Sequence, residues 1–271
     1  MTVQNNKLLN NKKGLVLGIA NDRSLAWGVA EFVANSGGNL ALTYQSEALK
    51  KRVVPLSEKI KTKHVYQCDV QDYQDLPIFF QNLSKDFGKL DFIVHGIAFS
   101  NKEELKGEYV QTSKENFLMT LEISCYSFTS LVQNALPYLN DGASLLTLSY
   151  YGAEKVIPHY NVMGVAKSAL ETSVKYLAAD LGKRNIRVNA ISAGPVRTLA
   201  ASGISDFRYI LKWNQLNSPL ERNIDLKDVG GAAVYLLSDL SSGTTGEIIH
   251  VDGGYNIIGM KNVNAPDISK V

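Results

Sequence analysis

The chain has 271 residues, 45% of them hydrophobic, and a formal net charge of +2. A chain of this length can bury one large core, and its scattered lysines and arginines form no stripe or arm, which disfavours nucleic acid as a partner. No run approaches the ~20 apolar residues that span a bilayer. We therefore expect a soluble, cytoplasmic protein without membrane contacts.

The polar leader at residues 1–13 has neither the apolar core of a signal peptide nor the Arg and Ser of a transit peptide. We expect a single domain at residues 14–259, followed at residues 260–271 by a loose tail or a small subunit contact. Cys68 and Cys125 are far apart and in no CxxC pair, which predicts reduced, buried thiols. The four histidines are dispersed, so no metal site is predicted.

Short apolar runs alternate with amphipathic segments from residue 14 onwards, which predicts strands alternating with helices. Strands are predicted at residues 14–18, 39–44, 64–68, 90–94, 144–148, 187–191 and 248–251. Helices are predicted at residues 25–36, 47–61, 73–87, 114–136, 160–181 and 226–238, with a weaker helical pattern at residues 196–219. This rhythm predicts a Rossmann-like, doubly wound, seven-stranded parallel sheet with helices on both faces.

Small and polar residues follow the carboxyl ends of these strands. In a doubly wound sheet, ligands bind beyond those ends, near the point where the strand order reverses. We therefore expect one crevice to be lined by Gly18, Gln45, Asp69, residues 96–98, Ser149, Tyr150 and residues 192–195.

The loop after the first strand is a candidate pyrophosphate site, because a helix N-terminus follows a glycine there. Nine residues separate Gly18 from Gly28, so the spacing is not GxGxxG and an ordinary strand-to-helix turn remains the alternative. Ser24 is expected to cap the helix, to place its backbone against phosphate, or both.

The end of the second strand indicates which cofactor is preferred. Gln45 offers neutral hydrogen bonding there, and no adjacent Arg can neutralise a 2′-phosphate, which favours NADH over NADPH. The basic residues at 50–52 lie a turn or more downstream and leave NADPH open. Asp69 and Val70 are expected to bracket the adenine, with a helix N-cap as the alternative for Asp69.

Tyr160 and Lys167 are the candidate catalytic pair. Seven residues apart, they lie almost on one line of a helix, two turns from each other. A phenol beside an ammonium can act as an acid or oxyanion stabiliser, because the positive charge favours developing phenolate. The alternative is an amphipathic helix whose border carries both residues.

These residues belong to a longer pattern that resembles the short-chain dehydrogenase/reductase superfamily and, within it, the bacterial NADH-dependent enoyl-[acyl-carrier-protein] reductases of the FabI type. The resemblance runs from residue 14 to about residue 260, and its most specific pieces are residues 44–45, 67–70, 146–150, 160–164, 188–195, 197–203 and 251–254. Ordinary ketoreductases of the superfamily carry the tyrosine four residues before the lysine. That position is Met163 here, and the displaced Tyr160 is typical of the enoyl reductases.

The resemblance implies a role in cofactor binding for residues at several strand ends. Gly18, Ser24 and Leu25 would contact the pyrophosphate and its ribose, Gln45, Asp69 and Val70 the adenosine, Ile97 the nicotinamide ribose, and Val196, Arg197, Thr198, Leu199 and Ala200 the carboxamide and phosphates. Lys167 would bind the nicotinamide ribose hydroxyls.

The family reaction, in type II fatty acid synthesis, adds hydride from NADH to the β carbon of a trans-2-enoyl thioester. Tyr160 would bond the thioester carbonyl and stabilise the enolate oxygen. Tyr150 would assist in catalysis or is only a packing tyrosine. Which group delivers the final proton stays open.

Residues 196–219 correspond to the family's substrate-binding flap, where Ala200, Ala201, Ile204 and Phe207 suit an acyl chain. Ser100 replaces a more usual alanine near the substrate, and Ala98 a more usual glycine. Arg197 and Arg208, with Lys212, either face an acidic acyl carrier protein or form a solvated charged surface.

The resemblance further implies a homotetramer in which the helices at residues 114–136 and 160–181 pack between subunits. Two alternatives remain: another oxidoreductase of the superfamily that acts on a ketone or alcohol, and a catalytically silent dinucleotide-binding regulator. The joint presence of Tyr160 and Lys167 disfavours the regulator.

Overall fold

The computed structural model describes residues 7–199, 201 and 204–268. Seven parallel strands form one sheet in the order β3-β2-β1-β4-β5-β6-β7. The strands are β1 (Lys13–Leu17), β2 (Asn39–Tyr44), β3 (Val65–Gln67), β4 (Leu90–His95), β5 (Leu139–Ser149), β6 (Arg187–Ala193) and β7 (Ile248–Val251). The order reverses between β1 and β4, so the predicted doubly wound sheet is confirmed and its switch point lies there.

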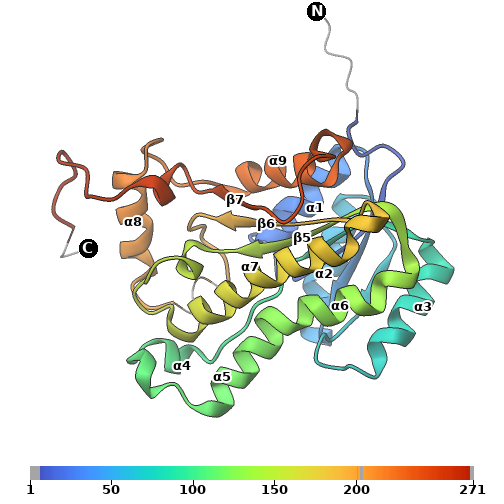
Figure 1. The fold of residues 1–271 in the computed structure, drawn as a ribbon, viewed down its shortest axis with the longest axis horizontal. Helices are drawn as coiled ribbons and strands as arrows, with labels where there is room; N and C mark the ends of the chain where they lie inside the picture. Colours follow the sequence, from blue (N-terminus) through green and yellow to red (C-terminus); the bar gives the residue numbers. More distant parts are fainter. Residues whose placement is uncertain (1–6, 200, 202–203, 269–271) are drawn as a thin grey trace, which may run out of the picture.

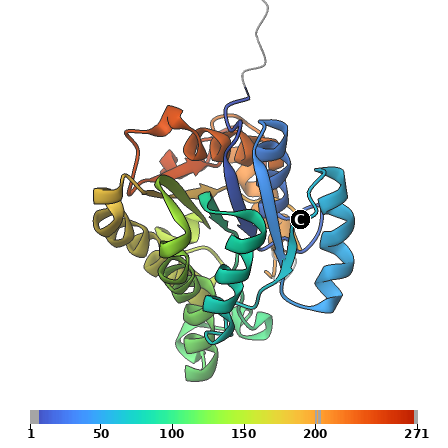
Figure 2. The same cartoon turned by 90° about the vertical axis from the view of Figure 1, so that its right-hand side faces the viewer.

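Helices cover both faces of the sheet (Figures 1 and 2). They are α1 (Leu25–Asn35), α2 (Glu47–Lys59), α3 (Asp75–Phe87), α4 (Lys102–Leu105), α5 (Lys114–Leu121), α6 (Ser127–Ala135), α7 (Asn161–Leu181), α8 (Phe207–Asn217) and α9 (Leu226–Leu237). Apolar side chains of α1, α2 and α9 pack on one face, and those of α3, α6 and α7 on the other. Because both faces are covered, strands such as β4 have an almost continuous apolar sequence; Phe92, Ile93 and Val94 are fully buried.

The predicted helix at residues 114–136 is interrupted in the structure. A π-helical turn (Glu122–Tyr126) joins α5 to α6, and the last predicted turn is a 3-10 helix (Leu136–Tyr138) that contains Pro137. Directly after the π turn, the Ser127 hydroxyl donates to the Ile123 carbonyl at 2.6 Å. Hydrophobic periodicity gave no sign of the π turn, because the buried residues of α5 in front of it, Asn116 and Thr120, are polar.

Strand β5 begins five residues earlier than predicted at residue 144. The residues Asp141 and Gly142, whose sequence is typical of a turn, form an irregularity inside the strand, where the pairing with β4 shifts register between Leu90 and Phe92. Gly142 has a φ of 80° there, a conformation that favours glycine. Helix α4 and the following 3-10 turn (Tyr109–Gln111) were not predicted either.

Parts of the predicted leader and tail pack on the domain. Leu9 is fully buried, and its amide donates to the Ser36 carbonyl at 3.0 Å. In the tail, the Asn262 amide donates to the Asn217 side chain at 2.8 Å, and Ile268 is buried. Residues on both sides of the predicted domain, outside residues 14–259, therefore contact it.

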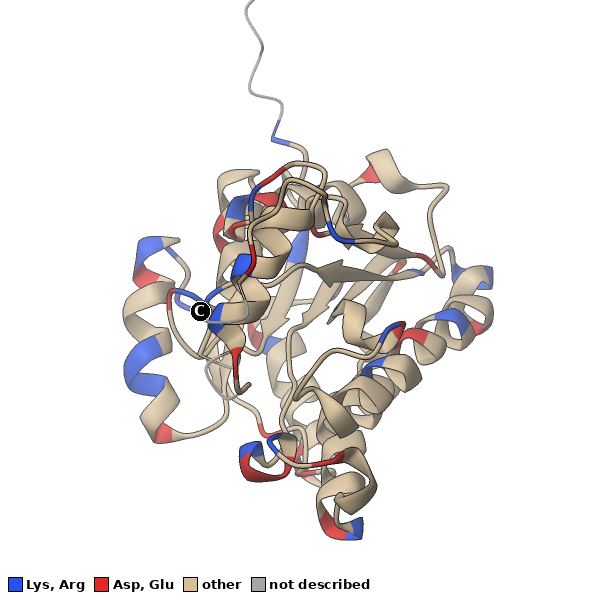
Figure 3. Cartoon of the chain, turned by 90° about the vertical axis from the view of Figure 1, so that its left-hand side faces the viewer, with Lys and Arg blue, Asp and Glu red and all other residues tan. Residues whose placement is uncertain are grey.

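Charged residues of both signs alternate over the face of the molecule shown in Figure 3. Cys68 and Cys125 are buried and free, as predicted, and burial raises the pKa of the Cys68 thiol to about 12. In the described part of the chain, no helix is long and apolar enough to cross a membrane.

Candidate active site

The loop after β1 has a backbone conformation that brings it close to the end of β4, the neighbouring strand. Gly18 has a φ of 94°, and a Cβ built on it would lie 2.1 Å from the Gly96 carbonyl oxygen at the end of β4. Ser24 is the N-cap residue of α1, yet its side chain does not cap the helix. Its hydroxyl instead accepts from the Ala20 and Asn21 amides at 3.0 and 3.1 Å, which fixes the loop that leads to the helix N-terminus.

Two predicted adenosine residues meet at the neighbouring strand ends. The Gln45 side chain donates to the Asp69 carboxylate at 2.9 Å. Asp69 also accepts from the Gln71 amide, in a turn that precedes α3. The alternative of a helix N-cap for Asp69 is wrong, because α3 begins at Asp75. Val70 is buried beside them.

Tyr160 is held by the turn in front of α7 rather than by the helix itself, which begins at Asn161. The Asn161 side chain donates to the Leu105 and Gly107 carbonyls at 3.2 and 2.8 Å. A Cβ on Gly152 would lie 2.3 Å from the Tyr160 ring, so the ring packs where only glycine leaves room. These contacts fix the phenol against the loop after β5.

The rings of Tyr150 and Tyr160 lie edge to face, with centroids 5.0 Å apart. Both sit in an apolar cluster that includes Leu105, Met163 and Ile204. Burial raises the pKa of each phenol well above its usual range. Both tyrosines therefore stay protonated at neutral pH and can donate a hydrogen bond.

Lys167 is 5% exposed, and its ammonium is directed to the sheet. Lys167 Nζ donates to the Leu148 carbonyl of β5 at 2.7 Å. Burial lowers the pKa of Lys167 to about 8, an effect that Cys125 and Glu171 oppose. Burial dominates the pKa of Tyr160, and Tyr150 and Glu171 raise it further.

The other predicted substrate and cofactor residues differ in their burial and in their contacts. Ser100 accepts from the Thr120 hydroxyl of α5 at 2.8 Å, and Ile97 packs, half-buried, on the same side of the sheet. Leu25, at the start of α1, and Val196, beyond β6, pack on the other apolar cluster. Further along the chain, the Thr198 hydroxyl accepts from the Ala201 amide at 3.0 Å, and Arg197 and Leu199 are exposed. Phe207 is half-buried at the start of α8, outside the cluster that contains Ile204, and Ala200 lies outside the described residues.

The arrows of β5 and β6 in Figure 1 point towards the end of the molecule where α8 lies. The helix N-terminus at Ser24, the polar pair Gln45–Asp69 and the buried ammonium of Lys167 all lie at carboxyl ends of the sheet. A helix N-terminus suits a pyrophosphate, neutral and acidic hydrogen-bonding groups suit an adenosine, and an ammonium suits ribose hydroxyls. The donor set therefore fits a dinucleotide.

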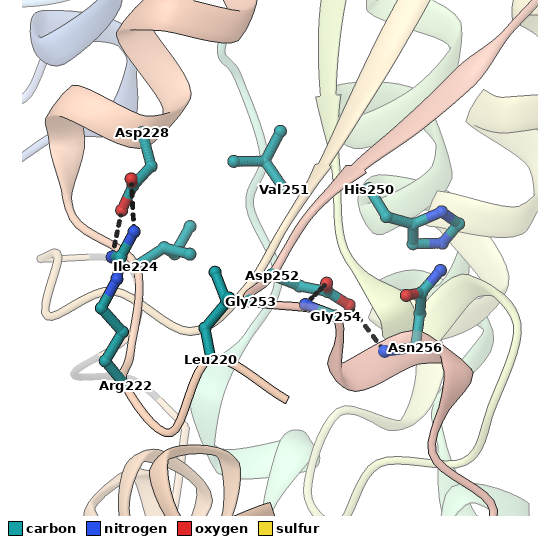
Figure 4. Close-up of a pocket in the computed structure, with 10 residues that line it drawn as sticks. All are labelled: Leu220, Arg222, Ile224, Asp228, His250, Val251, Asp252, Gly253, Gly254 and Asn256. Carbon is teal, nitrogen blue, oxygen red and sulfur yellow. Dashed lines mark hydrogen bonds and ion pairs between the residues drawn. The ribbon is translucent and has the colours of Figure 1, made fainter. Parts of the chain in front are cut away.

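A cavity of about 280 Å³ lies after β7, and neither Tyr150 nor Tyr160 lines it (Figure 4). The Asp252 carboxylate accepts from the Gly254 and Asn256 amides, both at 2.8 Å, and shapes this loop. A Cβ on Gly194 would lie 2.9 Å from the Asp252 Cα, so this loop also supports the chain after β6.

Sequence reasoning missed Asn161 and Glu171. The signal for Glu171 was its position, four residues after Lys167 on the same side of the helix. Asn161 gave no comparable signal, because its carbonyl partners lie in the unpredicted segment around α4.

The strand order, the loop at Gly18 and the pair Tyr160 and Lys167 define a dinucleotide-dependent oxidoreductase of the short-chain dehydrogenase/reductase class. Residues 18–256 match the family model described as enoyl-(acyl carrier protein) reductase. The chain belongs to this enoyl-(acyl carrier protein) reductase family.

Relatives of the family are similar over nearly the whole chain. Enoyl-[acyl-carrier-protein] reductase [NADH] 1 of Rhizobium meliloti is 59% identical over 97% of this chain and 96% of its own. The FabI enzyme of Rickettsia typhi, named in the same way, is 57% identical over 93% of this chain and 97% of its own. The solved enoyl-(acyl-carrier-protein) reductase of Anaplasma phagocytophilum, in complex with NAD, has a TM-score of 0.92 and 60% identity, covering 96% of this chain and 98% of that one.

Proposed function

We infer that this chain is an NADH-dependent enoyl-[acyl-carrier-protein] reductase, which reduces the trans-2 double bond of enoyl thioesters in the elongation cycle of type II fatty acid synthesis. One observation of the site carries this inference: a buried, neutral Tyr160 lies against Tyr150, seven residues before a buried Lys167. The names of the relatives, which include NADH, agree with it.

NADH would be held by the loop from Gly18 to Leu25, the pair Gln45 and Asp69, and the ammonium of Lys167. When bound, it supplies the hydride that reduces the β carbon. Val70, Ile97 and residues 196–200 are proposed to complete the site, because they follow the ends of neighbouring strands. Lys167 would release the Leu148 carbonyl and donate to the ribose hydroxyls.

Tyr160 is proposed to donate its phenol proton in a hydrogen bond to the thioester carbonyl oxygen. Charge develops on this oxygen as the β carbon is reduced, and a positioned donor stabilises it more than it stabilises the ground state. The raised pKa of Tyr160 suits a group that donates a hydrogen bond and keeps its proton. Tyr150 lies close enough to Tyr160 to orient the phenol or to assist.

The acyl chain would lie along the apolar cluster that Tyr160 shares with Ile204 of the flap. Ser100, Ala200 and Phe207 are proposed to line the remainder. Arg197 and Arg208 are exposed in the segment of residues 196–219 and would face the acidic surface of the acyl carrier protein.

We also propose a homotetramer built through α5, α6 and α7. Leu118 is 56% exposed, Tyr126 50% and Tyr176 73% in the single chain, which is apolar surface that a partner subunit would cover. A cytoplasmic location stays a prediction.

The test is a paired spectrophotometric assay with NADH, and separately NADPH, of a trans-2-enoyl thioester and the matching 3-oxo thioester. Rapid NADH oxidation with the enoyl substrate alone is expected. Turnover of the 3-oxo thioester alone would instead assign the chain to carbonyl reduction. NADH binding without any turnover would favour a silent regulator.

A further inference from the structure

Glu171 lies one helical turn after Lys167 and joins α7 to the end of β5. The Ser149 hydroxyl donates to Glu171 Oε1 at 2.5 Å. Ser149 is 4% exposed and Glu171 is half-buried. A half-buried carboxylate loses part of its hydration, so a hydrogen bond of this kind is needed to hold it.

Lys167 and Glu171 contact consecutive residues of the same strand. Lys167 donates to the carbonyl of Leu148, and Glu171 accepts from the side chain of Ser149, the next residue. Residues four apart on a helix are neighbours on its surface. Lys167 and Glu171 therefore lie on one side of α7 next to the end of β5, where Glu171 acts on the ammonium through its charge and not through an ion pair or hydrogen bond.

Few other charged or titratable groups face this pair. Lys167 interacts electrostatically with Cys125 from the π turn and with His95 from β4. Glu171 interacts with Glu154 and His250, which bond each other at 2.6 Å. His95 is buried in its neutral form, and burial raises the pKa of the Cys125 thiol. Glu171 is thus the carboxylate placed to offset the buried charge of Lys167.

We propose that Glu171 is a positioning residue for Lys167: its carboxylate offsets the buried charge of the ammonium at the end of β5, where Lys167 can bind the nicotinamide ribose. This inference rests on the proposed role of Lys167 in cofactor binding and assigns Glu171 no contact with the substrate.

The acid–base properties of the pair agree with this arrangement. Burial lowers the pKa of Lys167 to about 8, and the charge of Glu171 raises it against that effect. Burial, with a smaller effect of Glu154, raises the pKa of Glu171, which the Ser149 hydrogen bond, His250 and Lys167 oppose. Without the carboxylate, Lys167 would lose its proton at a lower pH.

The test compares three variants of the full chain. Glu171→Gln removes the charge but keeps a carbonyl oxygen that can accept from Ser149. Ser149→Ala removes the hydrogen bond but keeps the charge. Glu58→Gln makes the same charge change on the exposed surface of α2 and is the matched control. NADH affinity is measured by fluorescence titration from pH 6 to pH 9, and the thermal unfolding midpoint shows whether each variant is folded.

In Glu171→Gln, the loss of NADH affinity on the alkaline side should move down by about one pH unit, the size of shift that a nearby opposite charge gives. If the pKa of Lys167 falls by that amount from about 8, the protonated fraction at pH 8 drops about fivefold, while at pH 6 it hardly changes. Ser149→Ala should shift the profile much less, and Glu58→Gln should match the wild type.

An equal loss of affinity at every pH in Glu171→Gln would mean that the residue is merely structural, and an unchanged profile would mean that it has no role. The enoyl reductase assay of the wild type separates the two proposals. If the wild type binds NADH with the stated pH dependence but does not reduce an enoyl thioester, the proposed function fails and the role of Glu171 stands.

Discussion

Gly18 and Gly152 are the residues whose lack of a side chain most directly shapes the site. Gly18 brings the ends of β1 and β4 together, and Gly152 leaves room for the ring of Tyr160. At Gly18 a Cβ would collide with the backbone of Gly96, and at Gly152 it would collide with the ring of Tyr160. Both positions therefore require glycine.

Gly18→Ala should lower the free energy of unfolding by more than about 1 kcal/mol, because alanine must adopt a positive φ and its Cβ meets the Gly96 carbonyl. Urea denaturation measures this loss. Gly231→Ala is the matched control. Gly231 is in α9, with open space around its Cβ position, so alanine should stabilise the helix by about 0.5–1 kcal/mol. Equal effects of the two substitutions would contradict this account of Gly18.

At the residue scale, the sequence was sufficient to predict that Gln45 and Asp69 lie together at strand ends, because parallel strands end at the same edge of the sheet. It could not predict the direction of the Lys167 ammonium or the use of the Ser24 hydroxyl. Both depend on buried backbone groups that become available only once the loops are folded.

At the scale of elements, His95 connects β4 to two others. Its imidazole nitrogens lie 3.0 Å from the Thr147 hydroxyl of β5 and 2.9 Å from the Ser127 hydroxyl, where α6 begins. His95 is fully buried, and burial, with a smaller effect of Lys167, lowers its pKa to about 3. The neutral ring is therefore the form that holds these elements together.

This pKa predicts how stability depends on pH. Between its ordinary value and about 3, the unfolded chain binds a proton that the folded chain does not, so stability falls as the pH falls. From about pH 6 to pH 5, the free energy of unfolding should drop by about 1.4 kcal/mol per pH unit more in the wild type than in His95→Gln. Parallel pH profiles of the two proteins, from urea denaturation, would contradict the assignment.

Element boundaries were predictable where the hydrophobic pattern changes sharply, as at β2 and α9. They were not predictable at the π turn, in β5 or in α4. The π turn follows a helix whose buried residues, Asn116 and Thr120, are polar. The irregularity in β5 has the sequence of a turn, and α4 is a single short turn whose Asn101 cap leaves a weak signal. In each case the local sequence underdetermines the structure and tertiary contacts decide it.

At the scale of the whole molecule, the doubly wound parallel sheet was predictable from the alternation of strands and helices, since parallel strands need crossover helices. The order of its strands comes from the structure. The flap was predictable only as an irregular segment. The structure adds that Ile204 reaches the tyrosine cluster and that α8 lies at the carboxyl end of the sheet (Figure 1).

Binding of NADH should stabilise the whole domain. At a concentration one hundred times its dissociation constant, a ligand that binds only the folded state adds about 2.7 kcal/mol. For a chain of this size that corresponds to a rise of roughly 5 °C or more in the midpoint of thermal unfolding. NADPH at the same concentration should give a smaller rise, because Gln45 offers no charge to a 2′-phosphate. A larger rise with NADPH, in a scanning fluorimetry comparison, would overturn the cofactor preference.

The central claim is that the Tyr160 phenol stabilises charge on the substrate's carbonyl oxygen, and it is tested most directly by kcat of Tyr160→Phe with a trans-2-enoyl thioester. The loss of one hydrogen bond to a charged group, about 1.5–3 kcal/mol, predicts a fall in kcat of about ten- to a hundredfold. NADH affinity should be unchanged. The matched control is Tyr151→Phe, which should keep its kcat. The Tyr151 phenol that this variant lacks donates to the Asn256 carbonyl at 3.2 Å. A Tyr160→Phe enzyme as fast as the wild type would contradict the account.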